Sequence, residues 1–363
     1  MFVKLKYLLS SIGRGATPSN SYYNGELLWV TISDIQDSFI STTIKKITSP
    51  ALKDYHLKLF PIDSIAISLR GSLKFGILLK EATVSENCCL LFCDPSRLNY
   101  FYLYYYFLYL RSINFSLFYP RGSLFQTITI DVLKSLPIPF FPLSHQGQIV
   151  TFLNLKFDLI QELLLKIDLL LKKLEDYQAS IIYEKIYQKS YPRKKANSYI
   201  SILGGVPCSY DPKGFIPVYG SGGIFQKTNQ ILYSGESVLV GRKGTLNKSF
   251  YLSSSSQFWI VDTVYCIQNK NPLFLNLKYF YYFYCSLNFK EFQSGSVLPS
   301  MTQSSILSLL LPLPSLIQQN AIVSELDSKI CLLSQLQHYY QSLRAHLEEY
   351  QQSLLYETFQ NLL

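Results

Sequence analysis

The sequence predicts a mixed α/β protein with an internal repeat. Two similar domains, each with a small β-sheet, are joined by two long helices that form an antiparallel coiled coil with pseudo-twofold symmetry. Residues 175–184 (EDYQASIIYE) recur as residues 348–357 (EEYQQSLLYE), with six of the ten positions identical and an offset of 173 residues. At the same offset, Arg70-Gly-Ser-Leu73 is matched by Lys243-Gly-Thr-Leu246. A fixed offset over several landmarks indicates a tandem duplication.

Each half of the chain is predicted to hold a globular domain, a Leu-Pro-x-Pro motif and a long helix. The motifs lie at residues 136–139 and 311–314. The chain is long enough for two separate cores. The predicted boundaries are 1–140 for the first domain, 141–190 for the first helix, 191–314 for the second domain and 315–363 for the second helix.

Both helices carry apolar residues at alternating steps of four and three, which is the signature of a coiled-coil seam. The second seam is more polar, with Gln337, Arg344 and Gln351 at core positions, and Ser315 with Gln318 predicts a capping box at its start. We expect the helices to pair antiparallel, with the duplicated domains at opposite ends of one rod. The seam residues are Leu153, Phe157, Ile160, Leu164, Ile167, Leu171, Leu174 and Ile181, followed by Leu326, Ile330, Leu333, Tyr340, Leu347 and Leu354.

The domains themselves show short strands separated by glycine-rich turns. In the first domain a glycine- and serine-rich loop at 10–25 precedes predicted strands at 27–32, 63–69 and 87–92 and an aromatic helix at 100–110. In the second domain a basic linker at 192–195 is followed by a loop at 201–207 and by residues 216–225 in the place of the first strand. Strands at 237–241 and 258–267 and an aromatic helix at 279–285 come next. The aromatic run at 100–110 is well short of the roughly 20 residues that a membrane-spanning helix needs, so we expect it to be buried.

The net charge of +9 is confined to the predicted domains. Residues 1–144 hold 14 Lys and Arg against 9 Asp and Glu, and residues 191–315 hold 11 against 4. The two helices are neutral (6 against 6 in 145–190) and acidic (2 against 5 in 316–363). Two basic surfaces favour a polyanion bound at two points, although ordinary solvated lysines explain the charge equally well.

The seven cysteines are odd in number and show no second cluster of Cys or His at zinc-ligand spacing. We therefore expect free, mostly buried thiols in a reducing compartment and no metal site. The amino-terminal apolar run is too short for a signal peptide, which predicts a cytoplasmic location.

Several local motifs, in their order and double occurrence, resemble the DNA-specificity subunit of type I restriction-modification systems. These are Gly15-Ala-Thr-Pro-Ser19, Leu28-Trp-Val-Thr-Ile-Ser-Asp34, Ser68-Leu-Arg-Gly-Ser72, and Leu136-Pro-Ile-Pro139 leading into Gln146-Gly-Gln-Ile-Val150, with equivalents in the second half. The resemblance covers essentially the whole chain. One departure is Gly204-Gly-Val-Pro-Cys208, which replaces the Gly-x-Thr-Pro-Ser loop in the second copy.

The resemblance implies a non-catalytic subunit that binds double-stranded DNA. Each target-recognition domain would read one half of a bipartite, asymmetric site, while the helices set the spacing and dock two methyltransferase subunits. Endonuclease/translocase subunits would join the full complex. This chain would bind no cofactor itself, since S-adenosylmethionine, ATP and Mg belong to the partner subunits, and it would have no membrane partner.

Predicted DNA contacts divide by role. Arg and Lys that contact phosphates contribute affinity that is independent of the DNA sequence. A few loop side chains that contact base edges contribute the sequence specificity. The candidates are Arg14, Ser19, Asn20, Tyr22, Tyr23, Arg70, Lys74 and Arg121 in the first domain, and Tyr219, Ser221, Lys227, Arg242, Lys243 and Lys248 in the second.

Two other classes of function remain open from the residues alone. Asn271-Pro-Leu-Phe274 resembles the base-holding motif of DNA amino-methyltransferases but has Leu where the second Pro belongs. Tyr219-Gly-Ser-Gly-Gly223 lacks the helix start and acidic partner of a nucleotide-binding loop. The other class, a coiled-coil scaffold without a DNA role, accounts for the helices but not for the two basic domains.

Overall fold

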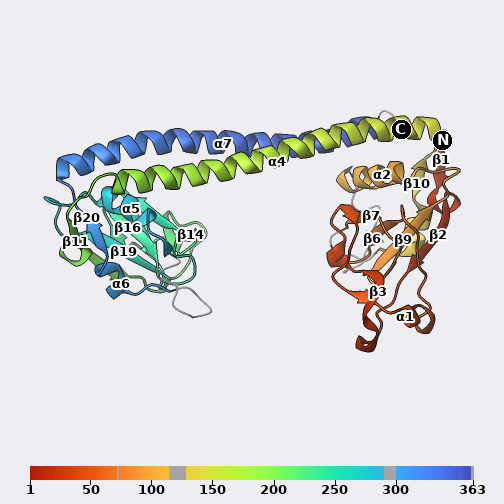
Figure 1. Cartoon of the computed structure of the whole chain (residues 1–363), viewed down its shortest axis with the longest axis horizontal. Helices are drawn as coiled ribbons and strands as arrows, with labels where there is room; N and C mark the ends of the chain where they lie inside the picture. The colour runs from red at the N-terminus through yellow and green to blue at the C-terminus, as the bar shows by residue number, and fades with distance from the viewer. Residues whose placement is uncertain (72, 114–127, 290–299, 361–363) are drawn as a thin grey trace. The chain divides into compact units, whose positions relative to one another are not determined.

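The computed structural model describes residues 1–71, 73–113, 128–289 and 300–360. The chain divides into two compact units: unit 1 comprises Met1–Lys166 with Leu343–Leu363, and unit 2 comprises Ile167–Ser342. Both division points lie inside long helices. Each unit therefore contains one part of α4 (Leu143–Tyr187) and one part of α7 (Leu316–Gln360) (Figure 1).

Unit 1 holds three sheets, in the orders β2-β9-β6-β7-β4, β5-β3-β8 and β1-β10. The elements before α4 are β1 (Phe2–Lys4), β2 (Leu9–Arg14), β3 (Tyr23–Val30), β4 (Ser38–Ile40), β5 (Lys46–Ile47), α1 (Ser49–Asp54), β6 (Ile65–Ser68), β7 (Phe75–Leu78), β8 (Ala82–Val84), β9 (Cys88–Cys93), α2 (Tyr100–Ile113), α3 (Ile130–Ser135) and β10 (Pro137–Pro139).

Unit 2 repeats this arrangement with sheets in the orders β12-β19-β16-β17, β14-β13-β18-β15 and β11-β20. Its elements between the long helices are β11 (Arg193–Lys195), β12 (Ile200–Gly204), β13 (Ile216–Gly220), β14 (Gly223–Thr228), β15 (Tyr233–Ser234), β16 (Ser237–Gly241), β17 (Ser249–Leu252), β18 (Gln257–Ile260), β19 (Val264–Asn269), α5 (Leu277–Cys285), α6 (Gln303–Leu307) and β20 (Leu310–Pro312).

The shared strand order and the two 45-residue helices confirm the predicted mixed α/β repeat. The main sheet of each unit is the one with the order β2-β9-β6-β7-β4 in unit 1 and β12-β19-β16-β17 in unit 2. It is buried on both faces, so its central strands are apolar at nearly every position. In unit 1, Ile65 and Ile67 on β6 pack toward α2, whereas Ala66 between them packs toward β3 and β8. In unit 2, Val238 on β16 packs toward α5, whereas Leu239 packs toward the sheet β14-β13-β18-β15.

A fully buried glutamine fastens each main sheet to its long helix. In unit 1, Gln146 on α4 accepts a hydrogen bond from the amide of Asn99 (2.9 Å) and donates to the carbonyls of Arg97 (3.0 Å) and Phe141 (2.8 Å). The Asn99 side chain in turn caps the first turn of α2. These bonds fix the start of the aromatic helix against the start of the long helix.

The same bonds recur in unit 2. Gln319 on α7 accepts from the amide of Asn276 (2.8 Å) and donates to the carbonyls of Phe274 (2.8 Å) and Pro314 (2.9 Å). Asn276 caps α5 as Asn99 caps α2. A buried amide with all of its hydrogen bonds made is stabilising and geometrically specific.

The last turns of each long helix pack into the core of the unit in which the other long helix starts. In unit 1, Phe359 at the end of α7 is fully buried against Tyr102, Tyr106 and Tyr109 of α2. In unit 2, Ile186 at the end of α4 is fully buried in the cluster that contains α5. The two positions are 173 residues apart, so they are equivalent in the repeat.

Within each unit, α4 and α7 run side by side in opposite directions (Figure 1). Ile160 and Leu164 pack against Leu347 and Leu354 in unit 1, and Lys185 pairs with Glu325 in unit 2 (2.9 Å). Ser315 and Gln318 form the predicted capping box at the start of α7. The other predicted seam residues, Leu153, Phe157, Ile167, Leu171, Leu174, Ile181, Leu326, Ile330, Leu333 and Tyr340, are likewise buried or half-buried.

Two stretches of the second domain differ from the sequence-based prediction. Residues 192–195 are not only a linker, because Arg193–Lys195 pairs with β20 as a strand. Residues 258–267 are two strands in different sheets, separated by a turn in which the amide of Val264 donates to the carbonyl of Val261. The second Leu-Pro-x-Pro motif lies two residues beyond the offset of 173 in the sequence, and in the structure Pro312 takes the place of Pro139 in the strand that precedes the helix.

The aromatic helices are buried, as predicted. The hydroxyls of Tyr102 and Tyr279 donate hydrogen bonds to the carbonyls of Pro139 and Pro312, respectively (both 2.9 Å). Among the helices in the described ranges, none has the length and apolar character needed to cross a membrane. All seven cysteines are free thiols, and Cys331 is exposed on α7.

Replacement of either buried glutamine by leucine should loosen one unit only. Gln319→Leu leaves the Asn276 amide and two carbonyls without partners, at a cost of about 1–3 kcal/mol. Hydrogen-exchange mass spectrometry should show faster exchange at the start of α5 in Gln319→Leu and at the start of α2 in Gln146→Leu. The exposed Gln335→Leu serves as the control and should leave both regions unchanged. Equal exchange in all three variants would contradict this role.

Candidate nucleic-acid interface

Basic side chains gather at one end of the main sheet of unit 1. Strand β2 ends at Arg14, which lies opposite Cys89 near the start of β9, and β6 ends at Ser68 opposite Cys88. Arg70 and Lys74 lie in the turn from β6 to β7 at this same end. The other end of β9 leads through Asn99 to α2 and to the glutamine contact with α4. The basic end is therefore opposite the end at which β9 leads to the start of α2 and to the glutamine contact with α4.

Local hydrogen bonds hold this basic end in shape. Arg14 Nε donates to the carbonyl of Glu86, and the amide of Lys74 donates to Ser68 Oγ (2.8 Å). Arg70 is exposed, and Gly71 beside it has a φ of 73°, a left-handed conformation that glycine adopts without strain. Within the described residues, neither the guanidinium of Arg70 nor the ammonium of Lys74 forms an ion pair, so both can reach an anion.

The loop after β2 is fixed to the sheet by close backbone approach. A Cβ at Gly15 would lie 1.5 Å from the carbonyl oxygen of Val84, so only glycine fits there. Trp29 Nε1 donates to the carbonyl of Ala16 (3.2 Å). In unit 2, Gly205 takes the same place, and Trp259 Nε1 donates to the carbonyl of the following residue, Val206 (2.7 Å). The sequence departure at 204–208 thus preserves the anchoring of the loop.

The predicted residues Ser19, Asn20, Tyr22 and Tyr23 lie together on the β3–α1 side of unit 1. Ser19 and Asn20 are exposed. The Tyr22 hydroxyl donates to Asp54 Oδ2 (2.6 Å), which raises the pKa of Tyr22 above its ordinary value of 10. The Tyr23 ring is half-buried against Trp29. Ser19 and Asn20 are therefore the members of this group most free to contact a ligand.

Unit 2 gathers basic residues at the corresponding end of its main sheet. Strand β16 ends at Gly241, and Arg242 and Lys243 follow it. The amide of Arg242 donates to the carbonyl of Thr263 (2.8 Å), and its guanidinium lies over the Tyr265 ring at 5.6 Å. Lys243 is exposed. The equivalence of Arg70 and Lys243 in the sequence therefore holds in the structure.

The remaining second-domain candidates divide into exposed and buried residues. Lys227 on β14 and Lys248 before β17 are exposed, and Ser221 lies in the β13–β14 turn, where a Cβ on Gly244 would approach Ser221 Oγ to 3.5 Å. Tyr219 is 8% exposed and packs on Phe250 at 5.7 Å. The prediction of a DNA contact for Tyr219 is therefore corrected: its ring belongs to the core. Arg121 lies outside the described residues.

Sequence reasoning missed an apolar group next to this basic end. Ile224 and Phe225 are exposed on the edge strand β14, and the pairing of β13 with β14 shifts register at Phe225, between Val218 and Tyr219. A bulge of this kind is not visible in the residue pattern, since the stretch 216–225 alternates too weakly to fix which face is buried.

The features that suggested an enzyme have structural roles. Residues 219–223 span the end of β13, the turn and the start of β14, and they do not lead into a helix, as a nucleotide-binding loop would. Asn271 and Phe274 form a turn, in which the Phe274 amide donates to the Asn271 carbonyl. The Phe274 carbonyl accepts a hydrogen bond from Gln319 Nε2 (2.8 Å). Over the described part of the chain, His, Cys, Asp and Glu do not gather in any group that could hold a metal ion.

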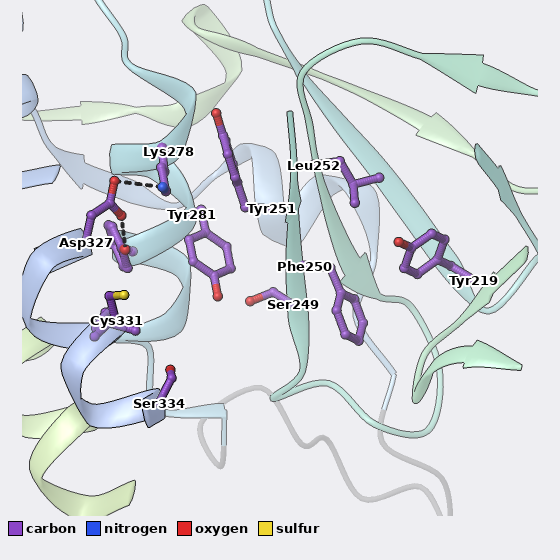
Figure 2. A pocket seen from close by; sticks show the side chains of 12 residues that line it. Tyr219, Ser249, Phe250, Tyr251, Leu252, Lys278, Tyr281, Asp327, Cys331 and Ser334 are labelled. Carbon is purple, nitrogen blue, oxygen red and sulfur yellow. Dashed lines mark hydrogen bonds and ion pairs between the residues drawn. The ribbon is translucent and has the colours of Figure 1, made fainter. Parts of the chain in front are cut away.

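Each unit has a groove beside its long helix. In unit 2 a pocket of ≈ 620 Å³ lies beside α5 and α7, where Asp327 accepts from Lys278 Nζ (2.7 Å) and from the Tyr282 hydroxyl (Figure 2). A pocket of ≈ 890 Å³ occupies the corresponding place in unit 1, where the Tyr105 hydroxyl donates to Asn154 Oδ1 (2.6 Å). Tyr105 and Asn154 are the repeat equivalents of Tyr282 and Asp327, so the grooves are a repeated feature.

Comparison with known proteins gives a consistent result. The MjaIX specificity subunit of a type I restriction enzyme from Methanocaldococcus jannaschii is 26% identical over 165 residues, which are 42% of this chain and 37% of that protein. The EcoprrI specificity subunit of a type I restriction enzyme from Escherichia coli is 22% identical over 343 residues, covering 87% of this chain and 84% of that protein.

A solved structure of a type I R-M system, described for its complex assembly and conformational transition, contains a chain that matches this one with a TM-score of 0.76. The match covers 99% of this chain and 97% of that chain at 16% identity, and it shows the shared fold. The model of the family described as "Type I restriction modification DNA specificity domain" matches residues 1–169 and 208–337. The chain therefore belongs to the family of type I restriction modification DNA specificity domains, which contributes recognition rather than catalysis.

Proposed function

We propose that this chain reads a bipartite, asymmetric site in double-stranded DNA, one half with each unit, within a type I restriction-modification complex. The observation that carries the proposal is the repeated basic end of the main sheet. Arg14, Arg70 and Lys74 gather there in unit 1, and Arg242, Lys243 and Lys248 gather there in unit 2. Lys and Arg on phosphates provide salt-dependent grip, and neighbouring loop residues are then placed at base edges.

The difference between the two units supports an asymmetric site. The loops beside the basic ends differ in length and residues, with η2 (Asn20–Tyr22), β5 and α1 in unit 1 and the β13–β14 hairpin in unit 2. Because base identity is read by a few side chains on such elements, two unlike sets of loops would read two unlike half-sites. The common frame gives both units the same manner of approach to the duplex.

The long helices would set the spacing of the half-sites and dock two methyltransferase subunits. A helix of 45 residues is about 68 Å long. Outside the seam, Leu159 and Leu163 on α4 and their equivalents Leu332 and Leu336 on α7 are at least 39% exposed. Exposed apolar residues one helical turn apart on both helices are typical of a surface that a partner covers.

Catalysis would reside in the partners of this chain. The proposed complex includes endonuclease/translocase subunits and works in the cytoplasm. S-adenosylmethionine, ATP and Mg would be bound by the partner subunits, and this chain would supply the choice of sequence.

Binding to duplex DNA, measured with and without the cognate methyltransferase subunits, tests the proposal. We expect sequence-selective binding that the methyltransferase strengthens, and methylation only when that partner and S-adenosylmethionine are both present. Methylation by the isolated chain would favour an amino-methyltransferase, and absence of DNA binding under both conditions would favour a scaffold. Methylome sequencing of cells with and without the chain identifies the target as the modified motif that is lost.

Neutralising one basic residue in each unit should weaken DNA binding without changing the preferred sequence. For Arg70→Ala and Lys243→Ala, the slope of log binding constant against log salt concentration should fall by roughly 0.9 each, because each removes about one phosphate contact. The exposed Lys173→Ala on α4 is the control and should leave the slope unchanged. A slope that falls for Lys173→Ala and not for the other two would place the DNA elsewhere.

Polar substitution on the exposed apolar positions should separate partner docking from DNA binding. In Leu159→Gln/Leu163→Gln one methyltransferase subunit should be lost, since a partner that covers these leucines loses apolar burial. Sedimentation velocity of the assembled complex gives the stoichiometry. DNA binding by the isolated variant chain should match that of the wild type. Full occupancy by two partners in this variant would rule out docking on this surface.

A further inference from the structure

The β13–β14 hairpin of unit 2 carries an exposed apolar surface beside the basic end of the sheet. Ile224 is 58% exposed and Phe225 is 50% exposed. Gln226 and Lys227, which follow on the same strand, are also exposed. Four consecutive exposed residues on one strand, two of them large and apolar, are unusual on a surface that meets only water.

The geometry of the hairpin holds these side chains in place. The register of β13 and β14 shifts between Val218 and Tyr219, so that Tyr219 faces Ile224 and Phe225 is the additional residue. A bulge of this kind re-aims a side chain. The Phe225 ring packs edge-to-face on Tyr210 at 5.7 Å and lies 3.3 Å from the place of a Cβ on Gly220. Phe225 is thus fixed in its exposed position before any partner arrives.

The turn of the hairpin also lies at the basic end of the main sheet. Its turn, residues 220–223, lies beside the loop of Arg242 and Lys243, since a Cβ on Gly244 would approach Ser221 Oγ to 3.5 Å. In the described part of the chain, β14 is an edge strand that pairs only with β13. Two antiparallel strands with one free edge have the width that the major groove of duplex DNA admits.

From these observations we propose that the β13–β14 hairpin enters the major groove and that Ile224, Phe225 and Gln226 contact bases of the half-site read by unit 2. Apolar side chains contact the thymine methyl group there, and an amide pairs with adenine N6 and N7. Lys227 at the end of the strand and Lys243 beside the turn contact the flanking phosphates. The inference rests on the proposed function and names the residues that determine specificity in one unit.

Charge favours DNA over a protein as the occupant. The residues that border the apolar pair on the hairpin and the adjoining loop include Lys227, Arg242, Lys243 and Lys248. Two acidic residues lie in this region: Asp262, whose carbonyl accepts from the Arg242 side chain (3.3 Å), and Asp211, whose amide donates to the carbonyl of Lys227 (2.8 Å). The basic residues outnumber them. An aromatic residue set among cations is the pattern expected of a nucleic-acid surface. Unit 1 has no such hairpin among its described residues, so the contact would be particular to one half-site.

The test compares Phe225→Ala with Phe274→Ala in the full chain bound to its methyltransferase subunits. Phe274 is 58% exposed but lies at the long-helix end of unit 2. Binding is measured on a duplex carrying the methylome-defined target and on a set in which each base pair, and each thymine methyl by replacement with uracil, is changed in turn. Ile224→Ser is the second variant, since its side chain packs on less of the core than Phe225.

We expect Phe225→Ala and Ile224→Ser to bind the target at least tenfold more weakly and to lose discrimination at base pairs of one half-site only. The salt dependence should stay that of the wild type, and Phe274→Ala should bind normally. Normal affinity and discrimination in both hairpin variants would overturn the inference alone. A wild-type homodimer that Phe225→Ala dissociates, with DNA binding unchanged, would also overturn it. Failure of the wild-type complex to bind any duplex would overturn the proposed function as well.

Discussion

The fold depends on the burial of two equivalent residues at the ends of the long helices, Ile186 in unit 2 and Phe359 in unit 1. Each lies in a core whose sheet and aromatic helix belong to the other copy of the repeat. A buried aromatic such as Phe359 contributes on the order of 3–5 kcal/mol, which is a large share of the stability of one domain. Neither copy of the repeat can therefore complete its core without the long helix of the other copy.

This constraint explains where the variable parts of the molecule lie. Gln146 and Gln319 fix the start of each long helix to the adjacent sheet, so the helix end of each unit has little freedom to change. The loops at the opposite end of each sheet only have to connect the strands of their own unit. Those loops hold the basic residues and, in unit 2, the exposed hairpin. A frame shared by both units at one end, and loops that differ at the other, let the two units present different surfaces without loss of the fold.

Much of this architecture follows from the sequence, and the errors have physical causes. The repeat, both long helices and the seam residues follow from the offset of 173 and from heptad spacing, which are periodic signals. The layering of two sheets in each unit was not predicted, because strands buried on both faces do not alternate. The sequence predicts Tyr219 at the DNA surface and does not single out Phe225. In the structure the Tyr219 ring is buried and Phe225 is exposed at the bulge, a difference that depends on strand pairing. Side-chain exposure at a register shift is a tertiary property.

Hydrogen-exchange protection of the assembled complex by its target duplex tests the central claim most directly. The account predicts slower exchange in peptides that contain Arg14 and Arg70 and in peptides that contain Ser221 and Lys243, at the basic ends of the two main sheets. Peptides from the exposed faces of α4 and α7 should be protected by the methyltransferase subunits and not further by DNA. Protection by the duplex along the helices, with the sheet ends unchanged, would contradict the account.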